Sequence, residues 1–196
     1  MTKIRALLAA SFVLAAGPAL AHPPPLGIPG FFGGLLHPAF TTAHMMATLA
    51  IGLLIGQQAP PWSRGAPAAF VVALIAGLAS LTTGIVPQRA GEGVLLLALV
   101  CGGMVALGRA LPEAAGYVLA VAAGAAIGLD SPPEVLSVRD ANLMLIGTAL
   151  GGTVLLVFVV EIATRLTHPW QRIGARILGS WIAASAILVL ALRFAA

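Results

Sequence analysis

Two histidines and two methionines lie close together in an apolar stretch, and their side chains are those most able to bind a metal ion. His37 is followed directly by Pro38, and His44 is followed by Met45 and Met46. Neutral imidazoles bind nickel, cobalt, copper and zinc, and thioethers add affinity for copper(I). On one unbroken helix the two imidazoles would share a face but lie about 10 Å apart, too far for one ion. A chain break at Pro38 would bring them together, and the sequence therefore predicts a metal site here. The alternative is two helix-end histidines bonded to backbone groups.

One carboxylate, Glu161, lies inside a later apolar segment. A charge in lipid is costly, so its presence needs a reason. Arg165 follows four residues later, a spacing that permits an ion pair at the membrane interface. The other hypothesis is a proton-coupling carboxylate that faces a cavity.

The elements that must position these side chains are membrane helices. Of the 196 residues, 60% are hydrophobic and only 8% are charged, whereas a soluble domain carries about 25% charged residues. Six apolar segments are long enough to cross a bilayer, and the short loops between them carry proline, which ends helices. We expect an all-α membrane protein with a six-helix transmembrane bundle in residues 22–196. The predicted spans are 41–57, 66–86, 93–107, 114–129, 143–164 and 173–194.

Residues 1–21 have the layout of a cleavable signal peptide. Lys3 and Arg5 precede a short apolar core, and Ala19-Leu20-Ala21 is a small-x-small cleavage site. Cleavage would leave His22 as the new N-terminus, where its amine and imidazole could chelate a divalent metal as a pair. The alternative is an uncleaved first helix and an incidental histidine.

Charges in the loops predict the orientation. A signal peptide puts residue 22 outside, and six spans return the C-terminus to the same side. We therefore expect a bacterial inner-membrane protein with both mature termini in the periplasm, which agrees with the positive-inside tendency. The inner loops then hold Arg64, Arg109, Arg165, Arg172 and Arg176, and the outer ones Arg89, Arg139 and Arg193. The acids Glu92, Asp130, Glu134 and Asp140 also fall outside, which suits a cationic ligand unless they are ordinary solvated loop residues.

Pairs of glycines four residues apart punctuate the spans at Gly52/Gly56, Gly124/Gly128 and Gly147/Gly151. Such spacing lets helices approach closely, either within the chain or between two copies of it.

The single cysteine excludes an internal disulfide. No Lys/Arg cluster or phosphate-binding loop is present, so we expect neither a nucleic-acid partner nor ATP-driven transport. No nucleophile–base pair is visible, and we do not expect an enzyme.

Two stretches resemble the HupE/UreJ family of membrane proteins. The first is Gly33-Gly34-Leu35-Leu36-His37-Pro38, followed by His44 and by Ala50-Ile51-Gly52-Leu53. The second, residues 176–184, reads Arg-Ile-Leu-Gly-Ser-Trp-Ile-Ala-Ala. The resemblance implies a six-span nickel or cobalt permease, or an accessory protein of hydrogenase or urease maturation. It also ties His37 and His44 to the metal.

The chain departs from the family pattern at two places. Ala43 stands where the family has an aspartate before the second histidine, and there is no His-rich segment in the middle of the chain. The remaining donors are softer, which shifts preference toward copper or toward no metal. Asp130 or Glu92 could replace the missing acid.

Our leading hypothesis is a secondary permease for nickel, cobalt or copper with His37 and His44 as ligands, tentatively joined by His22, Met45 and Asp130, and with Glu161 coupling a proton. No tightly bound cofactor is expected. The other hypothesis is a non-transporting subunit that docks a metalloenzyme or its maturation protein.

Overall fold

The computed structural model describes residues 28, 30–58, 62–84, 87–133 and 137–195. The predicted signal peptide, residues 1–21, and His22 lie outside this part of the chain. All regular structure in the described residues is helical, which confirms the expected all-α fold. The helices are α2 (Gly30–Phe40), α3 (Thr42–Gly56), α4 (Trp62–Ser80), the 3-10 turn η2 (Leu81–Thr83), α5 (Ala90–Leu107), α6 (Glu113–Leu129), α7 (Val138–Thr164) and α8 (Pro169–Ala195).

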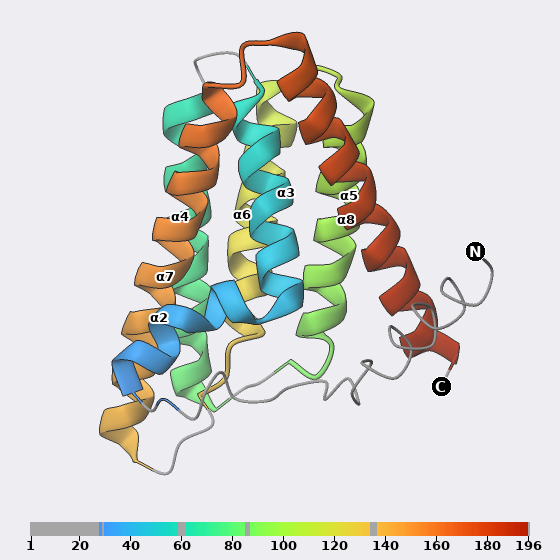
Figure 1. Cartoon of the computed structure of the whole chain (residues 1–196). Helices are drawn as coiled ribbons and strands as arrows, with labels where there is room; N and C mark the ends of the chain where they lie inside the picture. The colour runs from blue at the N-terminus through green and yellow to red at the C-terminus, as the bar shows by residue number, and fades with distance from the viewer. Residues whose placement is uncertain (1–27, 29, 59–61, 85–86, 134–136, 196) are drawn as a thin grey trace, which may run out of the picture.

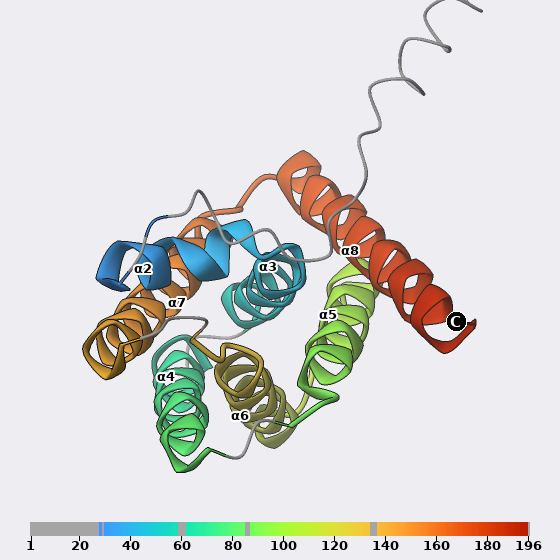
Figure 2. The same cartoon turned by 90° about the horizontal axis from the view of Figure 1, so that it is seen from below.

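The helices from α3 to α8 alternate in direction along one bundle, and α2 crosses its lower end as drawn in Figure 1. Viewed from that end, the helices α7, α4, α6, α5 and α8 follow one another in an arc around α3 (Figure 2). Each of the other α-helices contacts α3. Its aliphatic side chains from Ala50 to Ile55 are buried in the core.

Four helical stretches of the described chain are long and apolar enough to cross a membrane: Gly65–Thr83, Ala90–Leu107, Val138–Thr164 and Pro169–Ala195. The pair α2 and α3 passes the same test together but is bent by 65°, so it forms either a broken span or a re-entrant loop. At 17 residues, α6 is a shorter apolar helix. The chain is therefore a multi-pass membrane protein, and the count of six spans stays a prediction.

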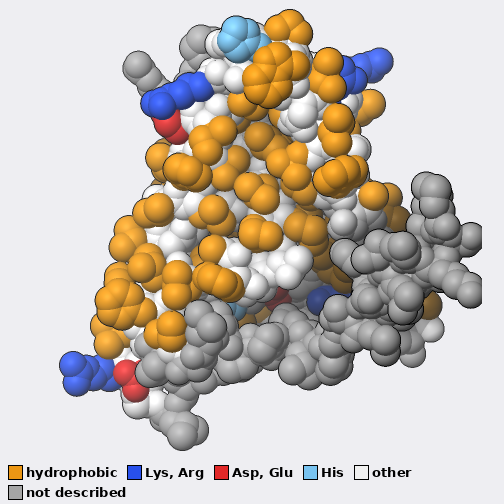
Figure 3. Space-filling model, viewed as in Figure 1, with side chains coloured by type: hydrophobic (Ala, Val, Ile, Leu, Met, Phe, Trp, Pro, Cys, Tyr) orange, Lys and Arg blue, Asp and Glu red, His pale blue; other side chains and the backbone are white. Residues whose placement is uncertain are grey.

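Apolar side chains cover the middle of the visible face (Figure 3). Helices α7 and α8 carry exposed apolar residues, among them Phe158, Trp181 and Leu188. Large exposed apolar surfaces of this kind are rare on soluble monomers and normal where lipid is the solvent.

Glycines let three pairs of helices touch backbone to backbone. Gly124 and Gly128 of α6 lie against the carbonyl groups of Phe70 and Leu74 on α4. Gly102 of α5 and Gly179 of α8 face each other, and a Cβ on Gly102 would stand 2.8 Å from the Gly179 oxygen. The third pair, α2 with α7, is described with the site below.

The predicted glycine pairs are packing faces within this chain. Besides Gly124 and Gly128, Gly52 and Gly56 of α3 pack on α7, against Val159 and Ala163. Without a hydrophobic driving force between helices in lipid, such close approach is what holds them together.

Adjacent glycines of α5 offer a matched test of this packing. We expect Gly102→Ala to lower the melting temperature of the detergent-solubilised protein, because the added methyl group forces the α5 and α8 backbones apart. Overpacking costs about 1–3 kcal/mol. Gly103→Ala is the control, since no neighbouring atom lies within 4 Å of its Cβ position. Equal melting temperatures for the two variants would contradict the close contact.

Candidate metal site

The bend between α2 and α3 places the two predicted histidines side by side. The chain break that sequence analysis considered at Pro38 does not occur there, because Pro38 lies inside α2, which continues to Phe40. The break comes at Thr41, whose backbone is extended at φ −81° and ψ 108°. The Thr41 N–H still donates to the His37 carbonyl oxygen over 2.9 Å. A single extended residue between two helical turns therefore turns the chain.

The imidazole rings of His37 and His44 have centroids 5.0 Å apart and planes inclined by 75°. The hydroxyl group of Thr41 lies 3.4 Å from His37 Nδ1. His44 is fully buried. The bend therefore removes the separation of two helical turns that an unbroken helix would impose.

A carboxylate from a distant part of the sequence meets His44. Asp130, the C-cap residue of α6, accepts a hydrogen bond from His44 Nε2 over 3.0 Å. The Asp130 side chain is 23% exposed, so it connects the buried ring to the surface at the lower end of the bundle. Metal-binding histidines characteristically donate their second ring N–H to such a carboxylate, which fixes the tautomer and the ring orientation.

The other ring nitrogen, His44 Nδ1, is buried and has no hydrogen-bond partner among the described residues. The same holds for the hydroxyl group of Thr48, one turn further along α3. A buried polar atom without a partner costs free energy, so both atoms fit a site that a ligand completes. Sequence reasoning did not single out Thr48, although its spacing of four residues from His44 was a usable signal.

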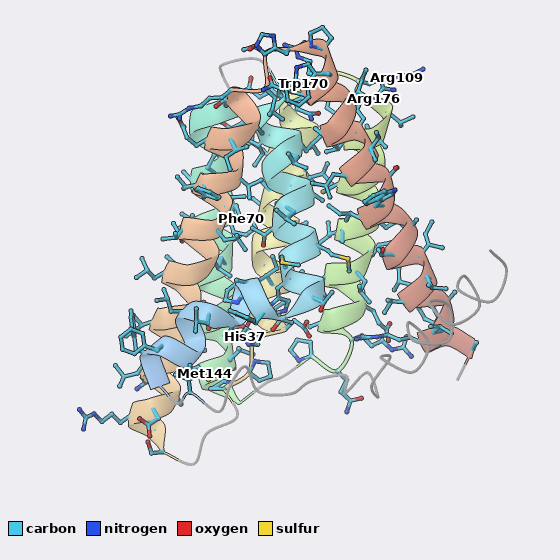
Figure 4. The ribbon with its side chains drawn as sticks, in the orientation of Figure 1. His37, Phe70, Arg109, Met144, Trp170 and Arg176 are labelled. Atoms are coloured by element: carbon cyan, nitrogen blue, oxygen red, sulfur yellow. The ribbon has the colours of Figure 1, made fainter. Side chains whose placement is uncertain are left out.

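Glycines position both halves of the site. On α7, Gly147 and Gly151 lie against the backbone of α2 at Phe31 and Leu35, and Gly34 of α2 lies against Met144 of α7. Figure 4 shows His37 and Met144 at this lower end of the bundle. This contact fixes the direction of α2 and so the place of His37.

Asp130 has a charged neighbour across α5. A Cβ on Gly91 would lie 3.1 Å from both Asp130 Oδ1 and a terminal nitrogen of Arg193 in α8. Sequence analysis did not connect Arg193 with the site. Arg193 therefore brings a positive charge close to the carboxylate that holds His44.

The remaining predicted residues are not all brought to this place. Met45 is adjacent to His44 in sequence but 36% exposed, and Glu92 lies in the first turn of α5. Glu161 is in the last turn of α7, at the opposite end of the bundle, where it pairs with Arg165. Both of those side chains are more than half exposed. No group of three His, Cys, Asp or Glu side chains within the described chain is arranged to hold a metal ion.

The sequence profile of the HupE / UreJ protein family matches residues 10–189, most of the chain. This chain belongs to the HupE/UreJ family. The HupE/UreJ family is a membrane family associated with nickel or cobalt uptake or with an accessory role for metalloenzymes, and it is not known for enzymatic activity. No curated protein and no solved structure matches the chain.

The bond between Asp130 and His44 can be tested by removing the carboxylate. We expect Asp130→Ala to destabilise this HupE/UreJ protein by about 1–3 kcal/mol, because it leaves a buried ring nitrogen unpaired. If His44 binds nickel, the variant should also weaken nickel binding by about 10–100-fold, the usual effect of losing such a carboxylate. Thermal unfolding in detergent, with and without Ni²⁺, measures both effects. Glu92→Ala, also at the lower end, is the control, and the same losses in it would contradict a specific role for Asp130.

Proposed function

We propose that this protein is a permease for a divalent transition-metal cation, nickel or cobalt, with copper as the further candidate, and that His44 binds the ion during transport. One observation carries the proposal: a fully buried imidazole has one nitrogen held by Asp130 and the other without a partner among the residues that the structure describes. Imidazole nitrogen suits these metals. Membership of the HupE/UreJ family supports the same substrate class.

Within this proposal, Asp130 orients the His44 ring and is not itself a direct ligand of the ion. Its oxygen already accepts the His44 N–H, whereas Nδ1 keeps its lone pair for a metal. His37 lies close enough to act as a second ligand from the other side of the bend. A small set of ligands also suits transport, because an ion must leave its site as readily as it enters.

The proposed direction of transport follows from the charges of the two ends. In the described part of the chain, the lower end holds as many acids as arginines, namely Glu92, Asp130 and Asp140 with Arg89, Arg139 and Arg193. Arginines outnumber acids at the upper end, namely Arg109, Arg165, Arg172 and Arg176 with Glu113 and Glu161. By the positive-inside tendency the lower end faces the periplasm, and the protein resides in the inner membrane. A cation would therefore reach His44 from the periplasm.

The second candidate function is a non-transporting accessory subunit of a metalloenzyme. It is favoured by the incomplete set of ligands in the described chain and by Ala43 in place of the family aspartate. A stoichiometric partner protein in a detergent pull-down, with no metal flux in liposomes, would select it. A second copy of the chain is another partner that the pull-down would reveal.

Uptake of radiolabelled metal tests the permease proposal. We expect His44→Ala to reduce Ni²⁺ or Co²⁺ flux into liposomes by at least about tenfold, since one lost ligand costs more than the 1.4 kcal/mol that corresponds to a factor of ten. His37→Ala should have a smaller effect in the same direction. His168→Ala removes an exposed histidine in the α7–α8 loop and is the control. Wild-type flux in the His37→Ala/His44→Ala double variant would overturn the site.

A coupling role for Glu161 stays a hypothesis, and its place favours a structural ion pair with Arg165. We therefore expect Glu161→Gln to change flux and its dependence on a proton gradient by less than about twofold, because exposed pairs contribute little. The measurement is Ni²⁺ uptake into liposomes with and without an imposed pH difference. A variant that transports but no longer responds to the gradient would instead establish the coupling role.

A further inference from the structure

A pocket of about 450 Å³ opens at the upper end of the bundle, away from the histidines. Its lining includes Gln57 and Gln58 after α3, Arg109 after α5, and Arg172 and Arg176 of α8. Figure 4 shows Arg109 and Arg176 together at this end. The described lining contains three arginines, all exposed, and no aspartate or glutamate, so it carries a net positive charge.

Two of the guanidinium groups are fixed by one edge only. Arg176 Nε donates to the Ala106 carbonyl oxygen over 2.8 Å, and Arg172 Nε donates to the Leu166 carbonyl oxygen over 3.2 Å. No described residue accepts a hydrogen bond from their terminal nitrogens, nor from the Arg109 guanidinium group. A guanidinium group held by its Nε edge presents the two parallel N–H groups that bind phosphate or carboxylate oxygens.

A neutral donor points to the same kind of ligand. Gln57 Nε2 is buried in the wall of the pocket and has no hydrogen-bond partner among the described residues. The Gln58 side-chain oxygen accepts a hydrogen bond from the Leu111 N–H over 3.2 Å, which leaves its amino group as a donor. A ligand that satisfies these amides must supply acceptor atoms.

The helix ends at this side of the bundle do not cancel the positive charge of the pocket. Helices α3, α5 and α7 end here and helices α4, α6 and α8 begin here, so their opposite partial charges of about half a unit each offset one another. The charge of the three arginines therefore remains. Arg165 is nearby, but its charge is already paired with Glu161 and it does not line the pocket.

We propose that this pocket binds a phosphate-bearing anion through Arg109, Arg172, Arg176 and the amide of Gln57. The phosphate group could belong to the headgroup of an anionic lipid or to a free phosphate compound, since both offer the same oxygens to the arginines. The site is separate from the histidine site and does not depend on the transport of a metal.

Two measurements on the full-length protein distinguish the sources. The first is the melting temperature of delipidated protein in a neutral detergent, titrated with sodium phosphate against sodium chloride of equal ionic strength. The second is native mass spectrometry of protein exposed to equal amounts of phosphatidylglycerol and phosphatidylcholine. We expect the Arg109→Gln/Arg172→Gln variant to bind its anion at least about tenfold more weakly than the wild type.

Arg165→Gln removes one positive charge at the same end but outside the pocket, and it should bind as the wild type does. Arg109→Gln alone disturbs no hydrogen bond of the described residues, and it is the test variant to use if the double variant does not fold. If inorganic phosphate stabilises the protein, the ligand is a free phosphate compound. If only phosphatidylglycerol is selectively retained, the ligand is a lipid headgroup. Either result supports the proposed anion site if the arginine variants no longer show the stabilisation or the lipid retention. No preference for phosphate or phosphatidylglycerol, or equal losses in Arg165→Gln, would overturn the proposal.

Discussion

Close contact between helix backbones, made possible by glycine, is the constraint on which the rest of the structure depends. Lipid tails are as apolar as leucine, so apolar burial cannot drive one membrane helix against another. In this chain Gly147, Gly124 and Gly102 stand where helix pairs meet backbone to backbone, in α2–α7, α4–α6 and α5–α8. These pairs surround α3, and the place of every side chain on α3 follows from how they pack.

The polar site is a consequence of that arrangement. The first two turns of α3 carry His44 and Thr48, and the turns above them bury only aliphatic residues such as Ile51 and Ile55. Polar atoms on a helix that is surrounded on all sides must find partners across helix contacts, because lipid offers none. The C-terminal end of α6 supplies one partner, Asp130, at the level where the aliphatic core stops. The site therefore sits at one end of the bundle and is closed toward the other.

Sequence patterns predicted the helices well and the contacts between them poorly. Proline-marked loops gave 114–129 for α6, which the structure places at Glu113–Leu129. The scan for apolar residues missed the polar first turn of α7, where Ser137 caps the helix, and the first turn of α8, where Pro169 occupies a position that tolerates proline. The candidate site was harder, because His44 and Asp130 are 86 residues apart and only packing brings them together. Asp130 was named as a substitute for the missing family aspartate, but nothing in the local sequence distinguished it from Glu92.

The two ends of the bundle set opposite electrostatic conditions for a cation. At the lower end, Asp130 and His44 Nδ1, which has no hydrogen-bond partner in the described part of the chain, favour a cation despite the nearby Arg193. At the upper end a cation would meet the three arginines that line the pocket. Like charges repel, so the three exposed arginines at this end disfavour a divalent ion there. Passage would also require α3 to move relative to the helix pairs that enclose it, and the extended residue Thr41 is where its backbone can turn without breaking a helix. An anion held by Arg109, Arg172 and Arg176 would lower the repulsion at the upper end, and it would do so without a metal ligand there.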